Sequence, residues 1–323
     1  MIITRTPLRI SFAGGGTDFE DFYKNGYGYV VSAAINKYVY VVVNKRFEDD
    51  IRVSYSKTEI VNDINFIEHG IVRECLRKLN IREGIEINII SDVPGKGTGL
   101  GSSSSLTVGL LYALHLFKGE KRTKRELAEE ACEIEIDILL EPIGKQDQYA
   151  AAFGGVNAFM FNDTGVSVFP IYMKHLEKWK LLSRLGIFHT GITRDSREIL
   201  QKQRDNIGNN YRNLLDLVLE AELLYQKLIT ENVDYIETTL NNAWRIKKSL
   251  ASAITNREIN EIYEIAKNNG ATAGKILGAG GGGFILFYSV DIPRVRNALS
   301  RYGIKMIENL DFDSGGTECI YNM

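Results

Sequence analysis

A glycine- and serine-rich segment in the first half of the chain has the residue types of a phosphate-binding loop. It is Pro94-Gly-Lys-Gly-Thr-Gly-Leu-Gly-Ser-Ser-Ser-Ser105, between a strand-like and a helix-like stretch. Its glycines let backbone N–H groups turn toward an anion, the following helix presents its N-terminus, and the serines add hydroxyl donors. Neither the P-loop nor the dinucleotide-binding pattern is present. The residues therefore favour a polyphosphate site of another kind over a plain turn.

A second glycine-rich corner, Arg9-Ile-Ser-Phe-Ala-Gly-Gly-Gly-Thr-Asp18, ends a strand-like stretch and places a hydroxyl and a carboxylate beside exposed backbone. The Asp18 carboxylate accepts two hydrogen bonds at a fixed spacing, which matches adjacent hydroxyls of a sugar. Glycine would let a sugar ring approach the main chain closely. The alternative is that Asp18 only caps a helix that begins at Phe19. The residues alone leave both interpretations open.

The segment Gly144-Lys-Gln-Asp-Gln-Tyr149 supplies a second candidate carboxylate. Asp147 could orient and deprotonate an attacking hydroxyl, and Lys145 would hold that carboxylate ionised and balance phosphate charge. Phosphoryl transfer requires such positioning and neutralisation more than covalent chemistry. The alternative is an ordinary surface ion pair.

A third glycine run, Lys275-Ile-Leu-Gly-Ala-Gly-Gly-Gly-Gly-Phe284, lies immediately before a strand-like stretch and far along the chain from the other two. So many glycines indicate either a backbone that passes close to another loop or ligand, or a hinge. Three glycine clusters in one chain favour the first interpretation.

A helix that begins near Thr123 carries two further candidate carboxylates. Thr123 and Glu126 have the spacing of a capping box, which fixes the start of this helix. Its apolar stripe consists of Leu127, Ala131, Ile134 and Ile138. Glu130 and Glu135 flank that stripe on opposite sides, and helical periodicity does not choose between them.

Hydrophobic patterning predicts the elements that position these residues. Stretches rich in β-branched and aromatic residues predict strands at Ile2–Ser11, Tyr29–Ile35, Tyr38–Asn44, Ile85–Ile90, Gly155–Phe161, Val166–Pro170, Gly283–Ser289 and Lys305–Asn309. Helical spacing predicts helices at Asn65–Leu79, at Ser103–Phe117 and, in several pieces, from about Ser196 to Asn268. This change of character predicts two domains, 1–170 and 171–323.

Composition restricts the partners. The 323 residues carry 39 basic and 41 acidic side chains, so a net charge of −2 offers no broad field for nucleic acid or an anionic membrane. Three distant cysteines, Cys75, Cys132 and Cys319, favour neither a disulfide framework nor a zinc ribbon. Without a signal-like or membrane-spanning run, the sequence predicts a cytoplasmic protein.

The order and wording of these motifs resemble the GHMP kinases, named for galactokinase, homoserine kinase, mevalonate kinase and phosphomevalonate kinase. Pro94–Ser105 is similar to the ATP phosphate loop of that family, Pro7–Asp18 to its first motif and Lys275–Phe284 to its C-terminal glycine motif. The resemblance spans nearly all of the chain. It implies an α+β fold, with an N-terminal domain like domain 2 of ribosomal protein S5 and a ferredoxin-like C-terminal domain.

The resemblance also implies ATP as the phosphate donor, Mg²⁺ as its metal, and a role for each matching residue. At the phosphates it places Gly97, Gly99, Gly101, Ser102, Ser103 and Ser104. It assigns Ser103 and Glu135 to Mg²⁺, choosing Glu135 over Glu130. The catalytic carboxylate would be Asp147, helped by Lys145, with Arg9 near the transferred phosphate. At the sugar it places Gly15, Gly16, Thr17 and Asp18.

Within the family, the motif sequences are most similar to those of bacterial D-glycero-D-manno-heptose 7-phosphate kinases, and fucokinases share part of them. The segments concerned are Arg9–Asp18, Gly144–Tyr149 and His189-Thr-Gly-Ile-Thr-Arg194. This resemblance implies phosphorylation of the anomeric C1 hydroxyl of a heptose 7-phosphate. Arg194 is then the candidate for the distal phosphate, since arginine suits bidentate phosphate binding, with Arg197 or Lys24 in reserve.

Two departures separate the chain from other branches of the family. Galactokinases carry Glu-His where this chain has Gly15-Gly16, and the Glu135 to Asp147 spacing is one residue longer than in mevalonate kinases. Two alternatives stay open: an anomeric fucose or hexose kinase, and a sugar sensor that binds without turnover. The presence of Asp147, Glu135 and the serine loop argues against the sensor.

Overall fold

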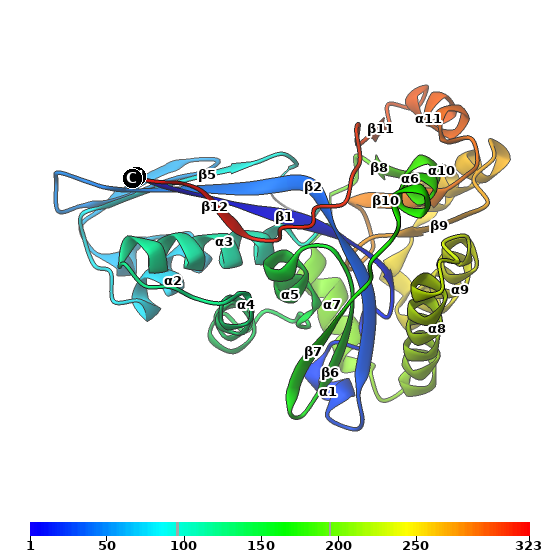
Figure 1. Ribbon diagram of the computed structural model, residues 1–323, viewed down its shortest axis with the longest axis horizontal. Helices are drawn as coiled ribbons and strands as arrows, with labels where there is room; N and C mark the ends of the chain where they lie inside the picture. Colours follow the sequence, from blue (N-terminus) through cyan, green and yellow to red (C-terminus); the bar gives the residue numbers. More distant parts are fainter. Residues whose placement is uncertain (95–96, 194) are drawn as a thin grey trace.

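The computed structural model describes residues 1–94, 97–193 and 195–323, and two β-sheets organise this part of the chain (Figure 1). In the described residues the larger sheet has eight strands in the order β12-β1-β2-β5-β3-β4, with β6 paired to β2 and β7 paired to β6. These strands are β1 Ile2–Ala13, β2 Gly28–Lys45, β3 Ile51–Ser54, β4 Thr58–Val61, β5 Ile85–Ser91, β6 Val156–Asn162, β7 Gly165–Pro170 and β12 Glu318–Asn322.

The helices associated with the larger sheet lie between its strands in the sequence. They are α1 Glu20–Tyr23, the 3₁₀ turn η1 Ile64–Phe66, α2 Gly70–Lys78, α3 Ser102–Phe117, α4 Lys124–Cys132, the π-helix η2 Glu133–Ile138 and α5 Gln146–Phe153. The predicted helix at Asn65–Leu79 is therefore two elements. Asp63 accepts a hydrogen bond from Asn65 N and starts the short turn, after which Ile67 is extended and ends it.

A smaller antiparallel sheet lies in the second half, with four strands among the described residues in the order β11-β8-β10-β9. Its strands are β8 Leu185–His189, β9 Ala273–Ile276, β10 Phe284–Tyr288 and β11 Lys305–Met306. The long helical stretch is found where the periodicity predicts it. The helices of this half are α6 His175–Arg184, α7 Ser196–Asp205, α8 Tyr211–Ile229, α9 Tyr235–Leu250, the 3₁₀ turn η3 Ser252–Ile254, α10 Arg257–Asn268 and α11 Ile292–Ser300.

Strand β2 pairs with three other strands of the larger sheet, β1, β5 and β6. Two separate strands were expected at Tyr29–Ile35 and Tyr38–Asn44, but the structure has one strand of 18 residues. Its register against β1 shifts between Pro7 and Leu8, so an irregularity rather than a turn joins the two halves of β2. The first part of β2 pairs with β6 and the second part with β5.

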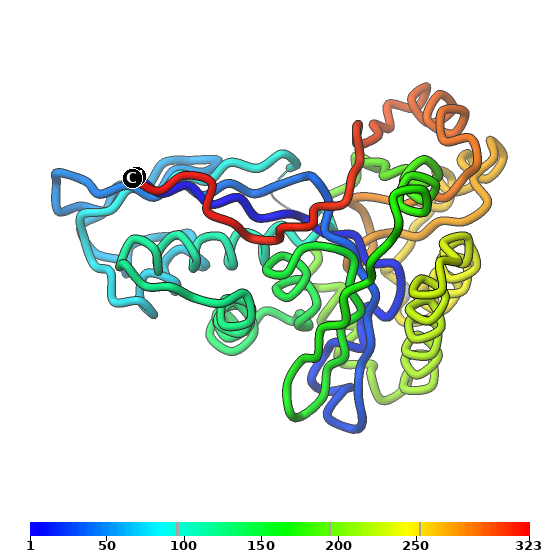
Figure 2. Tube along the Cα trace, viewed as in Figure 1, coloured from blue at the N-terminus to red at the C-terminus, as the bar shows by residue number. Residues whose placement is uncertain are grey.

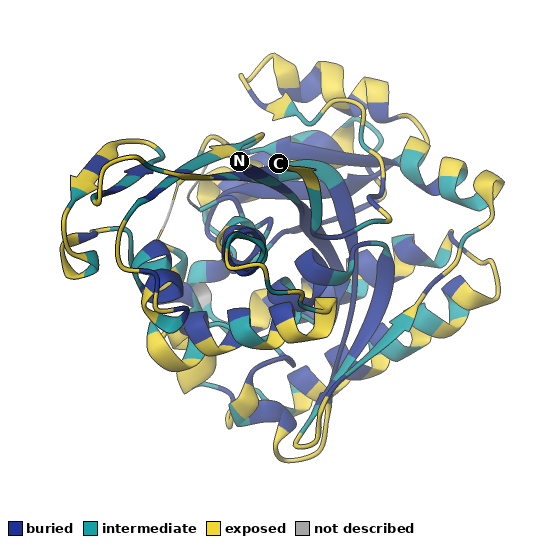
Figure 3. Cartoon of the chain, turned by 60° about the vertical axis from the view of Figure 1, so that its left-hand side comes forward, coloured by how far each residue is buried: buried dark blue, intermediate teal, exposed yellow. Residues whose placement is uncertain are grey.

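Helix α3 packs across β1 and β2 and is mostly buried, so the glycine loop before it is fixed to the sheet. Close approach is possible because Gly109 faces Thr6, where an added Cβ would lie 2.5 Å from Thr6 Oγ1. Thr4 Oγ1 also donates to the Gly109 carbonyl at 2.8 Å. Figure 3 shows the same layering, with buried strands enclosed by helices whose outer faces are exposed.

The end of the chain returns to the larger sheet, and Figure 2 shows this segment running back beside the first strand. Asp313 N donates to the Ala34 carbonyl at 3.0 Å, and Gly155 N donates to the Asp313 carbonyl at 2.6 Å. Strand β12 then pairs antiparallel with β1. Residues that follow the second sheet therefore complete an edge of the first. In the described part of the chain, no helix is long and apolar enough to cross a membrane.

Candidate active site

The phosphate loop is described from Gly97 onward; Gly95 and Lys96 lie outside the described residues. Gly97, Gly99 and Gly101 have φ angles of +68°, +73° and +77°, a region that favours glycine. Gly101 is the N-cap of α3 and supplies no side-chain cap. The first N–H groups of α3 are thus available to an anion, as the sequence pattern implies.

The C-terminal glycine run lies against this loop, backbone to backbone. Phe284 N donates to the Thr98 carbonyl at 3.1 Å. A Cβ on Gly99 would lie 2.4 Å from the Leu277 carbonyl oxygen, and a Cβ on Gly283 would lie 2.5 Å from the Gly97 carbonyl oxygen. Of the two interpretations of the glycine run, the structure shows the close backbone approach.

Asp147, on the first turn of α5, is held by Arg9 of β1. Arg9 Nε and Nη2 donate to the two carboxylate oxygens at 2.8 and 2.6 Å, while Nη1 donates to the Gly99 carbonyl at 2.6 Å. The Asp147 side chain is 22% exposed and that of Arg9 is 5% exposed, so the carboxylate is the accessible partner. A Cβ on Gly101 would lie 3.3 Å from Asp147 Oδ2, which places this carboxylate beside the start of α3.

Lys145 is placed differently from the sequence-based expectation. Its Nζ lies 5.4 Å from the centre of the Tyr23 ring, and this tyrosine raises the pKa of Lys145 against the opposing effect of burial. The cation that contacts Asp147 is therefore Arg9. The two residues are separated because Lys145 precedes α5 as its N-cap, whereas Asp147 is on the first helical turn.

The carboxylate of Asp18 is buried at the glycine corner. It accepts hydrogen bonds from Gly16 N at 3.0 Å and from Gln146 N at 3.1 Å, and burial raises its pKa, with a further contribution from the nearby Asp147. The short helix α1 has Phe19 as its N-cap, so Asp18 does not cap it. Gly144 is required here, because a Cβ on it would lie 2.1 Å from Asp18 Oδ2.

Thr17 is fully buried and stabilises this corner through the hydrogen bonds of its hydroxyl. Its hydroxyl donates to the Gly14 carbonyl at 2.8 Å and accepts from Tyr29 N at 3.0 Å. Thr17 thus fixes the turn that carries Gly15 and Gly16, and its hydroxyl already has two partners.

Two polar side chains that the sequence analysis did not select face the same corner. A Cβ on Gly15 would lie 3.5 Å from Gln146 Nε2 and 3.7 Å from Ser11 Oγ. Among the described residues, Ser11 Oγ and Gln146 Oε1 are buried without a hydrogen-bond partner. Such orphaned atoms suit a ligand with several hydroxyls. Both residues lie within the quoted motifs, beside Arg9 and Asp147, and that proximity was the available signal.

Glu135 and Ser103 meet at the first turn of α3. Ser103 Oγ donates to Glu135 Oε1 at 2.6 Å, and Gln148 Nε2 donates to Glu135 Oε2 at 2.7 Å. Burial raises the pKa of Glu135 to about 7, although the hydrogen bonds to its carboxylate favour the ionised form. Glu130 lies elsewhere, 2.7 Å from His115 Nε2.

The remaining serines of the loop have structural contacts in the free protein. Ser102 Oγ lies 3.0 Å from Thr98 Oγ1, and Ser104 is buried and hydrogen-bonds to the Glu135 carboxylate. Among the described residues, no group of three His, Cys, Asp or Glu side chains could hold a metal ion. Ser103 and Glu135 nevertheless fit Mg²⁺, which binds one or two protein oxygens and keeps water and phosphate oxygens as its other ligands.

The candidates for a distal phosphate lie away from these groups or outside the description. Arg194 is outside the described residues. Arg197 forms an ion pair with Glu141, and Lys24 lies 3.4 Å from Asp21. A small hollow beside Gly16 is lined by residues that include Gln203 of α7.

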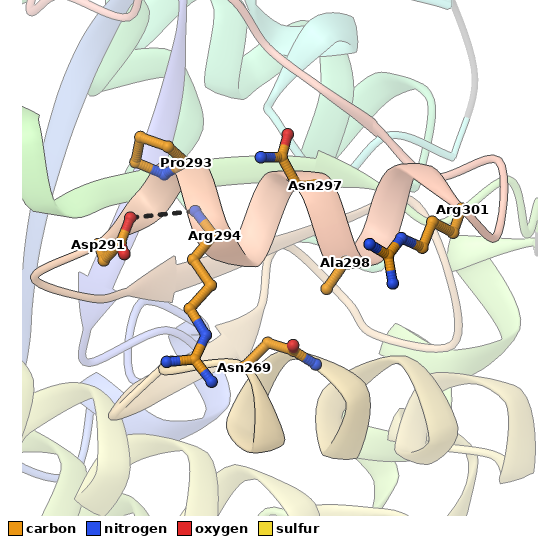
Figure 4. A pocket seen from close by; sticks show the side chains of 7 residues that line it. All are labelled: Asn269, Asp291, Pro293, Arg294, Asn297, Ala298 and Arg301. Carbon is orange, nitrogen blue, oxygen red and sulfur yellow. Dashed lines mark hydrogen bonds between the residues drawn. The ribbon is translucent and has the colours of Figure 1, made fainter.

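A larger, open cavity lies between the end of α10 and helix α11 (Figure 4). Asn269, Arg294 and Arg301 are among the residues that line it, and Asp291 accepts from Arg294 N at 3.1 Å as the N-cap of α11. The motif residues line no part of this cavity, so it is separate from the site described above.

Comparison with known proteins identifies the class that this site belongs to. The family model for the GHMP kinases N terminal domain matches residues 65–155, and the model for the GHMP kinases C terminal matches residues 221–305. The chain therefore belongs to the GHMP kinases, which transfer phosphate from ATP to small molecules. It is 33% identical to the D-glycero-alpha-D-manno-heptose 7-phosphate kinase of Campylobacter jejuni over 89% of each chain. Within the class it is a sugar kinase.

Solved structures show the same fold. A D-glycero-D-manno-heptose 1-phosphate kinase from Bacteroides thetaiotaomicron matches with a TM-score of 0.83 at 24% identity, over 100% of both chains. A putative sugar kinase from Campylobacter jejuni matches with a TM-score of 0.78 at 29% identity, over 98% of this chain and 97% of the other. The α+β GHMP kinase fold expected from the sequence is confirmed.

Proposed function

We propose that this kinase transfers the γ-phosphoryl group of ATP to the anomeric hydroxyl of D-glycero-D-manno-heptose 7-phosphate, giving the 1,7-bisphosphate. The similarity to the Campylobacter jejuni enzyme supports the choice of sugar. The observation that carries the reaction is the accessible Asp147 carboxylate, held by two hydrogen bonds from Arg9 beside the N-terminus of α3.

The proposed reaction is an in-line displacement. The C1 oxygen bonds to the γ-phosphorus, the bond from the γ-phosphorus to the β–γ bridging oxygen breaks, and ADP leaves. Asp147 accepts the proton of the C1 hydroxyl, which is more acidic than an ordinary alcohol and needs only a modest base. Arg9 and the N-terminus of α3 stabilise the negative charge of the transferred group.

We assign the metal position to Ser103 and Glu135. Mg²⁺ held there would neutralise charge on the ATP phosphates. Glu135 must be ionised to act as a ligand; burial raises its pKa, and a bound cation would favour the ionised form.

For the sugar we assign the corner formed by Gly15, Gly16 and Asp18, together with Ser11 and Gln146. The orphaned oxygens of Ser11 and Gln146 can bond to sugar hydroxyls. Gly15 and Gly16 leave room where galactokinases carry larger side chains, which favours a different sugar from galactose. Arg194 remains our candidate for the distal phosphate.

The test is ATP consumption with Mg²⁺ on heptose 7-phosphate, the unphosphorylated heptose, fucose and mannose. We expect turnover of heptose 7-phosphate alone, with new phosphate on C1. Arg194→Ala should raise KM for heptose 7-phosphate about tenfold or more, since it removes a charge-assisted phosphate contact. Arg197→Ala is the comparison, because Arg197 already pairs with Glu141.

Two other outcomes would redirect the proposal. Activity on fucose or mannose but not on the heptose 7-phosphate would keep a sugar kinase and discard both the heptose and the role of Arg194. Sugar binding without any ATP turnover would indicate a sensor.

A further inference from the structure

A lysine that no sequence motif marks lies against the C-terminal glycine run, beside the phosphate loop. Lys247 comes from α9, which packs against β1 and β9, and its side chain is almost wholly buried. Its Nζ donates to the Gly278 carbonyl, within the C-terminal glycine run. In the part of the chain that is described, no carboxylate forms an ion pair with it.

The contact with Gly278 puts Lys247 next to the phosphate loop. A Cβ on Gly278 would lie 2.4 Å from the Gly99 Cα, and the Gly99 carbonyl accepts from Arg9 Nη1 at 2.6 Å. Lys247, Gly278, Gly99 and Arg9 therefore form a continuous series of contacts that ends at Asp147. An ammonium group has three donors, so the bond to Gly278 leaves two for another acceptor.

The charges around Lys247 are unbalanced. Burial and, to a smaller extent, Arg9 lower the pKa of Lys247, Asp18 and Asp147 act in the opposite direction, and the net pKa is about 8. Lys275 of β9 is a third buried basic side chain there; burial, Lys247 and Arg9 all lower its pKa well below the usual value. Three basic side chains thus lie near two carboxylates, and burial raises the pKa of Asp18. Buried positive charge of this kind is stabilised when an anion binds.

Lys275 has its own partners. Its Nζ donates to the carbonyls of Ser11 and Phe12 at 2.9 and 3.2 Å, where it fixes the end of β1. Lys247 has a single backbone acceptor, the Gly278 carbonyl beside the phosphate loop, and is the basic side chain left to meet a ligand.

We propose that Lys247 binds the phosphoryl group in transfer, so that α9 brings a cation from the second half of the chain to the phosphate loop of the first. This inference rests on the proposed kinase reaction and adds a residue to it. Arg9 contacts the same group from the opposite side, which frees Asp147 to accept the proton of the sugar.

The first test compares Lys247→Met with Lys248→Met. Lys248 is the next residue of the same helix, but it is exposed and lies over the Trp244 ring. We expect Lys247→Met to lower kcat about 100-fold or more, as for loss of one group that stabilises the transferred charge. KM for the sugar should change less than about threefold, and Lys248→Met should leave kcat within about twofold of the wild type. A folded Lys247→Met enzyme with kcat within threefold of the wild type would overturn the proposal.

The second test measures nucleotide binding in the absence of sugar, so its result does not depend on the identity of the sugar substrate. Binding of AMPPNP with Mg²⁺ is measured by calorimetry at pH 8 in two buffers of different ionisation enthalpy. Because the pKa of Lys247 is about 8, this lysine is partly deprotonated in the free protein at pH 8. A phosphate ligand favours the charged form of Lys247, so nucleotide binding to the wild type should be accompanied by uptake of a fraction of a proton. Lys247→Arg, which stays charged, should lose that fraction; uptake equal to the wild type contradicts our assignment.

Discussion

At the scale of single residues, the carboxylates that we propose for catalysis and metal binding already have hydrogen-bond partners in the free protein. Arg9 occupies both oxygens of Asp147, and Ser103 and Gln148 occupy both oxygens of Glu135. Each of these bonds must be shared or exchanged when nucleotide and sugar arrive. On the proposed mechanism, catalysis therefore begins with a rearrangement of these hydrogen bonds.

Asp147→Asn tests the proposed base directly. The amide cannot accept the proton of the hydroxyl, so we expect kcat to fall by about 10²–10⁴, the usual contribution of a positioned general base. The affinity for ATP, measured by equilibrium binding, should change little. Asp137→Asn, an exposed substitution on the nearby π-helix, serves as the control. Near-normal turnover by Asp147→Asn would falsify the assignment.

Glu135 makes the stability of the metal-free enzyme depend on pH. Its pKa is raised from the ordinary value of 4.5 to about 7, so as pH rises between these values the unfolded chain loses this proton before the folded one. The contribution of Glu135 to stability is then complete below pH 4.5 and is lost as pH rises to about 7.

Glu135→Gln should remove this loss of stability with rising pH. With the metal chelated, we expect the melting temperature of the variant to rise relative to the wild type between pH 5 and 7.5, and the difference to level off above. Identical pH profiles for the two proteins would show that the buried carboxylate is already ionised at pH 5. With Mg²⁺ present, the variant should need a higher Mg²⁺ concentration for activity.

At the scale of elements, we propose that the interlocked glycine loops determine the shape of the phosphate site. Gly99→Ala combines a left-handed backbone with a Cβ 2.4 Å from the Leu277 oxygen, so the two loops must separate. We expect at least a tenfold rise in KM for ATP and a lower melting temperature. Gly119→Ala is the matched control: its φ is +77°, yet nothing lies within 4 Å of the added Cβ. It should cost only about 1–2 kcal/mol of stability, and equal effects of the two would argue against an interlock.

The helix with the metal-site carboxylate shows where sequence reasoning succeeds and where it stops. The capping box of Thr123 and Glu126 is confirmed, because it depends on neighbouring residues alone. Periodicity could not choose between Glu130 and Glu135, since the helix changes to π geometry at Glu133 and shifts the phase of every later side chain. Ile138, expected in the buried stripe, is instead 42% exposed.

The strands also separate into those that the sequence predicted and those that it did not. Composition predicted β1, β5 and β6 to within two residues, because these strands are rich in β-branched or aromatic residues. The bounds of β3, β4, β8, β9 and β12 were not predicted, since each strand is short and is defined by its partner in the sheet. Lys247 was missed for a similar reason, because only the packing of α9 on β1 makes an ordinary helical lysine part of a site.

At the scale of the whole molecule, two sheets share one site, and the last residues of the chain connect them. We propose that the functional halves divide near residue 170, with the segment after residue 310 returning to the first half. Asp313 holds this segment: it accepts from Gly315 N, Gly316 N and the Tyr38 hydroxyl at 3.0, 2.7 and 3.0 Å.

Asp313→Ala should therefore weaken the whole fold. It leaves buried donors unpaired, and we expect a loss of about 2–3 kcal/mol in the free energy of unfolding measured with urea. Asp311→Ala is the control, because Asp311 is 54% exposed and pairs with Lys178 at the surface. Its effect should stay below about 1 kcal/mol. Similar losses for both variants would show that the segment contributes little.

The pairing of β12 with β1 also sets the timing of folding during protein synthesis. The ribosome makes β1 first and β12 more than 300 residues later, so this edge of the large sheet stays open for tens of seconds at roughly 5–20 residues per second. An open edge strand is a template for aggregation. Arg5 on β1 reduces that hazard, since its charge disfavours pairing with a second nascent chain until Glu318 arrives as its permanent partner.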